Sequence, residues 1–129
     1  MKIENQVVTI DQAKKLTAFG VAADPLFWHV VNIDPITPLD IIQKWQHSNF
    51  DQCEKYPAYT VAELGVMVDW NHVSQSGPYK EDQHFYCFTH LQDYSDKNEA
   101  IVRADVLIYL LENHLTTPEE VNQIGRAHV

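Results

Sequence analysis

Two short stretches of the sequence place carboxylates close to imidazoles, the pairing used by a general base and the group that orients it. One stretch holds Asp69 and His72, and the other holds Glu81 and His84. The Ser-Gly-Pro between them is typical of a turn, so both stretches also suit a solvent-exposed hairpin. Asp69, His72 and His84 are therefore candidate pocket residues, with ordinary hairpin residues as the alternative.

A metal site is the second chemistry to consider, because His84, Cys87 and His90 are residue types that bind transition metals. Their segment is rich in aromatic residues and predicts a strand, on which successive side chains point to opposite faces. Cys87 would then face away from the two histidines, which would lie about 20 Å apart. The spacing predicts no metal site.

Other catalytic signatures are missing from the sequence. It has no nucleophile-elbow serine, no glycine-rich phosphate loop among its four glycines and no Cys-x-x-Cys pair. Cys53 lies near Asp51 and Glu54, surroundings that disfavour a reactive thiolate. The sequence predicts no catalytic residue, no cofactor and no metal ion, which disfavours an enzyme without excluding one.

The charge balance bears on partners. With 18 acidic residues against nine Lys and Arg, the formal net charge is −9, spread without long runs of one sign. Direct binding to nucleic-acid phosphates needs a concentrated basic surface, and no basic residues accompany the aromatic set Trp28, Tyr86 and Phe88. We expect these three to pack against a helix or a second subunit. The acidic surface also allows an inhibitor of a DNA-binding protein.

No apolar stretch approaches the roughly 20 residues of a membrane span, and the first residues lack the apolar core of a signal peptide. Cys53 and Cys87 are far apart in sequence and are expected to be thiols in a reducing compartment. We predict a cytoplasmic protein without a membrane partner.

The strongest structural signal is a long helix over residues 95–115. One broad apolar face predicts burial and consists of Ala100, Ile101, Ala104, Leu107, Ile108, Leu111 and Leu115. A second, narrower row lies roughly opposite and consists of Val102, Val106, Tyr109 and Leu110. This row is either core on a second side of the helix or the interface of a homodimer.

Four threonines are each followed three residues later by an acceptor side chain, a pattern typical of helix starts. They predict short helices over residues 10–19, 37–47, 61–68 and 118–124, with a loop over 48–59. Strand-forming residues predict strands at 27–33, 70–75 and 84–91, with a turn at Ser-Gly-Pro.

Together these elements predict an α+β fold. One small antiparallel sheet of about three strands packs against the long helix and three to four short helices. A chain of 129 residues is a common size for one core, so we expect a single domain over residues 1–124 and a flexible tail over 125–129.

Three parts of the chain carry a resemblance: residues 12–16 with Gly20, residues 56–65, and Glu99 and Ala100 with residues 107–113. In these the chain resembles a group of small uncharacterised proteins encoded in phages, prophages and related mobile elements of gut bacteria. The resemblance implies kinship, and it brings no activity and no functional residue.

Three functions follow as hypotheses. The first is a non-catalytic accessory protein of a phage or mobile element that acts through contacts with another protein. The second is a small enzyme or ligand-binding domain with a site near the 69–84 hairpin. The third is an acidic inhibitor of a DNA-binding protein.

Overall fold

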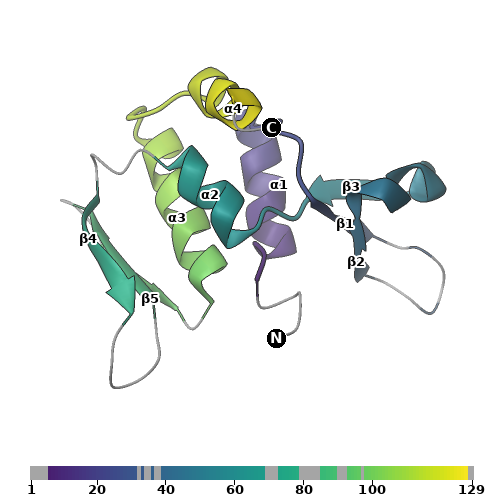
Figure 1. Ribbon diagram of the computed structural model, residues 1–129, viewed down its shortest axis with the longest axis horizontal. Helices are drawn as coiled ribbons and strands as arrows, with labels where there is room; N and C mark the ends of the chain where they lie inside the picture. The colour runs from purple at the N-terminus through teal and green to yellow at the C-terminus, as the bar shows by residue number, and fades with distance from the viewer. Residues whose placement is uncertain are drawn as a thin grey trace.

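The computed structural model describes residues 6–31, 33, 36, 39–68, 73–78, 85–89, 93–96 and 98–127, without the side chains of 73–78, 85–89, 93–95 and 124–127. The fold is α+β, as predicted (Figure 1). Its elements in chain order are α1 (Ile10–Phe19), β1 (Phe27–Val31), β2 (Leu39–Gln43), the 3-10 helix η2 (Lys44–Phe50), β3 (Glu54–Pro57), α2 (Val61–Met67), β4 (Val73–Pro78), β5 (Phe85–Thr89), β6 (Asp93–Asp96), α3 (Glu99–Glu112) and α4 (Pro118–Ala127).

The helices begin where the sequence supplies caps. The Thr9 side chain accepts from the Gln12 N–H at the start of α1, and the Gln12 side chain accepts in return from the Thr9 N–H. Thr60 and Glu63 form the same reciprocal pair at the start of α2. Gly20 ends α1 with φ at 96°, a conformation that costs glycine little. These two helices match their predictions closely.

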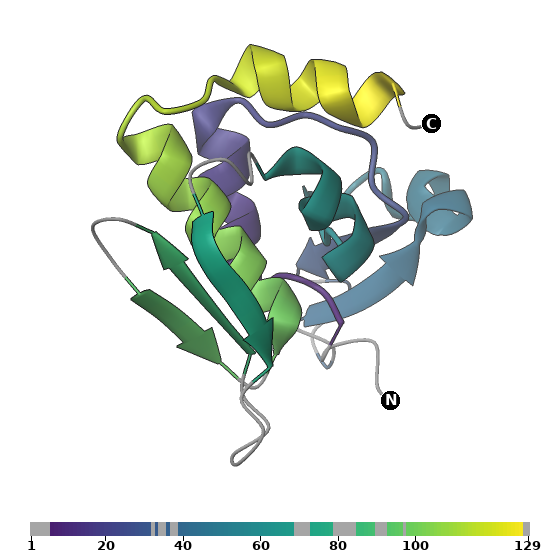
Figure 2. The same ribbon diagram turned by 60° about the vertical axis from the view of Figure 1, so that its left-hand side comes forward.

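The described strands form two antiparallel sheets, where the sequence predicted one. The first sheet has the order β2-β1-β3 and the second has the order β4-β5-β6. Figures 1 and 2 show them on opposite sides of the helices. The predicted pairing of residues 27–33 with the hairpin is therefore wrong, whereas the hairpin itself is confirmed as β4 and β5. β4 continues through the predicted Ser-Gly-Pro turn as far as Pro78.

Residues 37–59 depart most from the prediction. The expected helix over 37–47 is replaced by β2 and then η2, and the expected loop over 48–59 contains β3. Leu39, Ile42 and Trp45 do recur at helical spacing, but Leu39 and Ile42 lie on a strand that pairs with β1. A pairing partner outside the segment overrides a short helical pattern.

The main core lies among the four α-helices. Its largest fully buried side chains include Leu16 from α1, Leu64 from α2, and Leu107 and Leu110 from α3. α3 contacts α1 and α2, and it also contacts β5 and β6 of the second sheet (Figure 2). The predicted helix that packs on two sides is therefore confirmed, although it begins at Glu99 because residues 93–96 form β6.

α3 and α4 also begin at capping side chains. The Asn98 side chain accepts from the Ala100 N–H at 2.9 Å and so caps α3. Thr117 accepts from the Glu120 N–H at 3.2 Å in the first turn of α4. This last helix continues to Ala127, beyond the predicted end at residue 124. The division into a domain over 1–124 and a tail over 125–129 stays a prediction.

Candidate functional site

The first sheet and η2 form a unit that projects from the helical body, and we call residues 26–57 the arm (Figure 1). Strand alternation gives the sheet two faces. On one face, Val30 and Ile42 are buried, and the ring of Trp28 meets the ring of His47 edge to face at 4.7 Å between centroids. His47 belongs to η2, so this helix closes a small second core on the arm.

The opposite face holds the arm to the helical body through His29. This imidazole is 4% exposed, and its Nε2 lies 2.7 Å from the Val8 carbonyl oxygen. Because a carbonyl oxygen only accepts, Nε2 carries the proton, and Nδ1 is a buried acceptor without a hydrogen-bond partner. Burial lowers the pKa of His29, and the hydrogen bond to Val8 opposes this in part. The group is neutral in the folded protein at pH 7.

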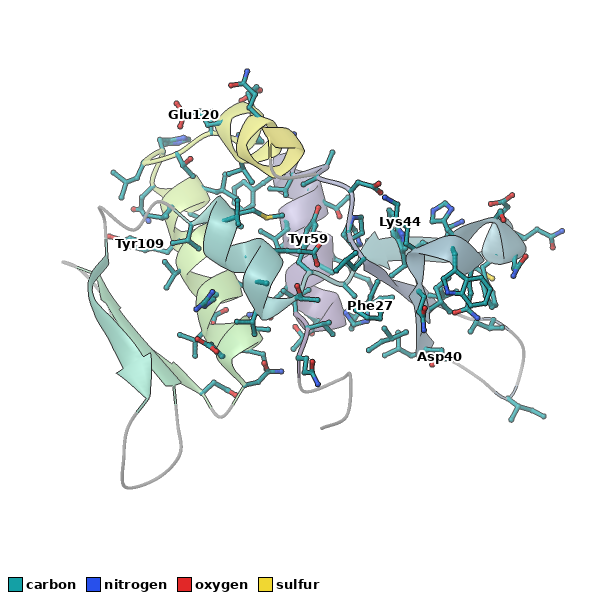
Figure 3. All side chains as sticks on the ribbon, in the orientation of Figure 1. Phe27, Asp40, Lys44, Tyr59, Tyr109 and Glu120 are labelled. Carbon is teal, nitrogen blue, oxygen red and sulfur yellow. The ribbon has the colours of Figure 1, made fainter. Side chains whose placement is uncertain are left out.

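Val8 is itself fixed from the other side, because its N–H donates to the Tyr59 carbonyl at 3.0 Å. The Tyr59 hydroxyl is fully buried and donates to the Ala23 carbonyl at 2.7 Å. Burial raises the pKa of Tyr59 above its usual range, so the hydroxyl stays a donor. Figure 3 shows Tyr59 within the helical body and Phe27 where the arm meets it. The base of the arm is therefore rigidly anchored.

The arm carries exposed apolar side chains. All four large apolar side chains that are exposed in the described part of the chain belong to it: Leu26 at 58%, Ile36 at 90%, Leu39 at 46% and Trp45 at 71%. Scattered single apolar residues are normal on a surface, whereas four on one projecting unit call for an explanation.

Trp45 is exposed but held in position. Its Nε1 donates to the Gln43 side-chain oxygen at 2.6 Å, and the Gln46 side chain accepts from the Gln43 N–H at 3.1 Å. Gln43 lies on the same face of β2 as Leu39 and Ile41, by strand alternation. This is also the face that carries His29, since Ile41 pairs with His29 and Leu39 pairs with Val31. The indole lies next to this row, and we call Leu39, Ile41 and Trp45 the β2 stripe.

The outer edge of β2 exposes more backbone hydrogen-bond acceptors than donors. The Lys44 N–H donates to the Leu26 carbonyl at 2.9 Å, so the backbone groups of Lys44 point toward β1. In an antiparallel pair every second residue points toward the neighbouring strand. The backbone groups of Leu39, Ile41 and Gln43 therefore point away from β1. The N–H groups of Ile41 and Gln43 are already used by the side chains of Asp40 and Gln46. The carbonyl oxygens point outward beside them.

The other edge of the first sheet, β3, is also unsuited to pairing. Ala58 N–H donates to the Phe27 carbonyl at 2.9 Å, which by the same alternation turns Pro57 outward. A proline has no N–H to give to an added strand. Both edges therefore resist strand addition.

The two lysines of the arm each form an ion pair within the molecule. Lys44 pairs with Asp24, and Lys55 pairs with Asp51 at 3.5 Å while it also donates to the His47 carbonyl. Both described cations of the arm are thus bound within the molecule. Figure 3 shows Lys44 and Asp40 toward opposite ends of β2.

The predicted site residues are placed as follows. Asp69, His72 and His84 lie outside the described residues. Trp28 belongs to the first sheet, whereas Tyr86 and Phe88 belong to β5 of the second sheet, so the predicted aromatic set does not share one sheet. No group of three or more His, Cys, Asp or Glu side chains that could hold a metal ion occurs among the described residues.

The second row of the long helix is core. Val102, Val106, Tyr109 and Leu110 are 1%, 0%, 6% and 0% exposed within the chain itself. The reading of this row as a homodimer interface is therefore wrong for this fold, because α2 and the second sheet together enclose α3.

Sequence reasoning missed the β2 stripe. It placed Leu39 and Trp45, with Ile42, at helical spacing in a short helix over residues 37–47. The adjacent β-branched pair Ile41 and Ile42, flanked upstream by Pro35 and Pro38, was the available signal for a strand.

Within the part of the chain that the structure describes, no helix has both the length and the apolarity needed to cross a bilayer. No protein-family model matches the chain, and neither a curated protein nor a solved structure is similar enough to indicate a relationship.

Proposed function

We propose that this protein is non-catalytic and acts by binding another protein through the arm. The observation that carries the proposal is the concentration of all four exposed large apolar side chains of the described residues on this one unit. Tryptophan is among the residues that most often dominate binding energy at protein interfaces. Trp45 combines high exposure with a fixed orientation, which reduces the entropy lost on binding.

The setting we propose is the cytoplasm of a bacterium that carries a phage or mobile element. The resemblance of three helix-forming segments to proteins of such elements supports it. The alternative, an enzyme or ligand-binding domain with a site near the 69–84 hairpin, depends on Asp69, His72 and His84, which lie outside the described residues.

The test is an affinity pull-down from host lysate, read by mass spectrometry, with wild-type protein and three variants. Trp45→Ser and Leu39→Ser remove apolar area from the β2 stripe, and Thr17→Ala changes an exposed residue on α1. We expect a partner retained by wild type and Thr17→Ala, and weakened about tenfold or more by Trp45→Ser. Retention of every captured protein by all variants would contradict the proposal.

Folding must be controlled, because a loss of binding through unfolding would be uninformative. Trp45 and Leu39 are exposed, so each variant should change the free energy of unfolding by less than about 0.5 kcal/mol. Urea unfolding followed by far-UV circular dichroism measures this directly.

A further inference from the structure

His29 is a buried polar residue at the joint between the arm and the helical body. Its Nε2 donates to the Val8 carbonyl at 2.7 Å, while its Nδ1 is buried and has no hydrogen-bond partner. The acceptor belongs to the body, since the Val8 N–H donates to the Tyr59 carbonyl at 3.0 Å. The imidazole therefore connects two units of the chain through one of its nitrogens and leaves the other nitrogen unused.

The two units have separate hydrophobic cores. The main core consists of residues outside the arm, and of the described arm residues only Tyr56 packs against it. The arm buries Val30 and Ile42 on its other face, where Trp28 meets His47. Figure 1 shows the arm projecting to one side of the helices. Movement of the arm away from the body would therefore expose little of either core.

Other polar contacts at the base of the arm lie at the surface. The Leu26 N–H donates to the Glu63 carboxylate at 3.2 Å in an exposed position. Lys44 pairs with Asp24, and both of these side chains are more than half exposed. Exposed ion pairs contribute little because water competes for both charges. The docking of the arm therefore depends chiefly on His29 and the surfaces packed around it.

The charged and titratable groups on the His29 side of the sheet come from β3 and α1. β3 presents Tyr56 opposite His29, with Glu54 two residues away on the same face. From α1, the Lys14 Nζ lies 5.6 Å from the centroid of the Tyr56 ring. β2 and the segment before α1 present no charged side chain on this side. Among the described residues, no carboxylate accepts from the His29 ring to stabilise a cation there.

We propose that His29 is a pH-sensitive latch, in which uptake of one proton at Nδ1 releases the arm from the helical body while both units stay folded. This inference goes beyond partner binding and does not depend on it. The added proton creates a second N–H that has no acceptor, on a cation that is buried. In the released arm, water solvates both N–H groups, so protonation favours release.

The direction with pH follows from proton linkage. Burial lowers the pKa of His29 in the docked arm, and the hydrogen bond to Val8 opposes this in part. The released arm therefore binds the proton more tightly, and docking weakens as the pH falls below about 6.5. One site changes the ratio of released to docked arm by at most about tenfold per pH unit. Between pH 7.5 and 5.0 the ratio should rise by up to about thirtyfold.

The experiment measures the separation of arm and body by double electron–electron resonance on the full chain, with Cys53 and Cys87 replaced by serine. Nitroxide labels on cysteines introduced at Ser48 of η2 and Thr17 of α1, both exposed, report on the arm. Labels at Thr17 and at exposed Glu112 of α3 report on the body. From pH 7.5 to 5.0 we expect a longer, broader distance component to appear for the first pair and no change for the second.

Two variants and one titration assign the change to His29. His29→Gln keeps an amide that can donate to Val8 but takes up no proton, so its distances should be the same at both pH values. His114→Asn replaces an exposed histidine whose φ of 57° asparagine tolerates, and it should behave as wild type. The His29 imidazole of the wild-type protein, followed by NMR, should titrate with the midpoint of the distance change, which needs no variant to fold.

Four results would overturn the latch. The first is an arm-to-body distance that stays the same at pH 5.0, and the second is an equal change in His29→Gln. The third is a parallel change in the body pair, because the whole chain would then unfold instead of releasing the arm. The fourth is a His29 titration midpoint that differs from the midpoint of the distance change. Each of these results leaves partner binding by the arm to its own test.

Discussion

Gln12 is the residue whose replacement tests the packing of the helical body most directly. It is 7% exposed, and its side chain makes three hydrogen bonds. Its oxygen accepts from the Thr9 N–H at 3.1 Å, and its nitrogen donates to the Ile101 carbonyl at 2.9 Å and to the Asp105 carboxylate at 2.8 Å. One side chain thus caps α1 and ties it to α3.

The cost of Gln12→Ala follows from these bonds. A hydrogen bond to a charged group contributes about 1.5–3 kcal/mol and a neutral one about 0.5–1.5 kcal/mol, and such terms are not fully additive. We expect a loss of about 2–4 kcal/mol, which is a large share of the stability of a typical domain. In urea the midpoint should fall by about 1–2 M with an unchanged slope.

The loss should also depend on pH through Asp105. Burial raises the pKa of Asp105, and the hydrogen bond from Gln12 lowers it in part. A carboxyl whose folded pKa is raised contributes stability that is present below its unfolded pKa and lost as the pH rises through the folded pKa. Gln12→Ala removes the opposing hydrogen bond and raises that pKa further. The penalty at pH 7 should therefore exceed the penalty near pH 4.

Urea unfolding at both pH values, with Thr17→Ala on the exposed side of α1 as control, measures these effects. A double-mutant cycle with Asp105→Asn isolates the pairwise energy. If Gln12→Ala costs no more than the control, or costs the same at pH 4 and pH 7, the account of the α1–α3 contact is wrong.

Three further changes test other contacts, each by urea unfolding. Burial lowers the pKa of His29, so the unfolded chain takes up a proton first and the free energy of unfolding should fall as the pH drops below about 6.5. His29→Gln should flatten this decline between pH 7.5 and 5.5, and an unchanged slope would refute the role of His29. Gly65→Ala places a methyl group against the Arg103 guanidinium, which can move away only by giving up its hydrogen bond to the Val61 carbonyl at 2.9 Å. The variant should be destabilised by about 1 kcal/mol despite the better helix propensity of alanine, so a stabilised variant would contradict this packing. Tyr59→Phe leaves the buried Ala23 carbonyl without its donor at a cost of about 1–3 kcal/mol, and a neutral result would show that the bond adds nothing.

Much of the helical body was determined by the sequence alone. Thr9 with Gln12, and Thr60 with Glu63, fix the starts of α1 and α2 through contacts three residues apart. The apolar periodicity of α3 likewise predicted a helix enclosed on two sides. These signals are local, because a helix satisfies its backbone within its own segment.

The sheets and the arm were decided by tertiary structure. A strand satisfies its backbone only through another strand, and His29 of β1 finds its neighbours at Ile41 and Tyr56, which are separated from it by intervening segments. A short apolar run does not specify which strand it pairs with. The sequence therefore predicted the wrong neighbours for β1 and a helix at Leu39 and Trp45. Only the pairing of β2 with β1 places Leu39 on a strand, and Trp45 follows on η2.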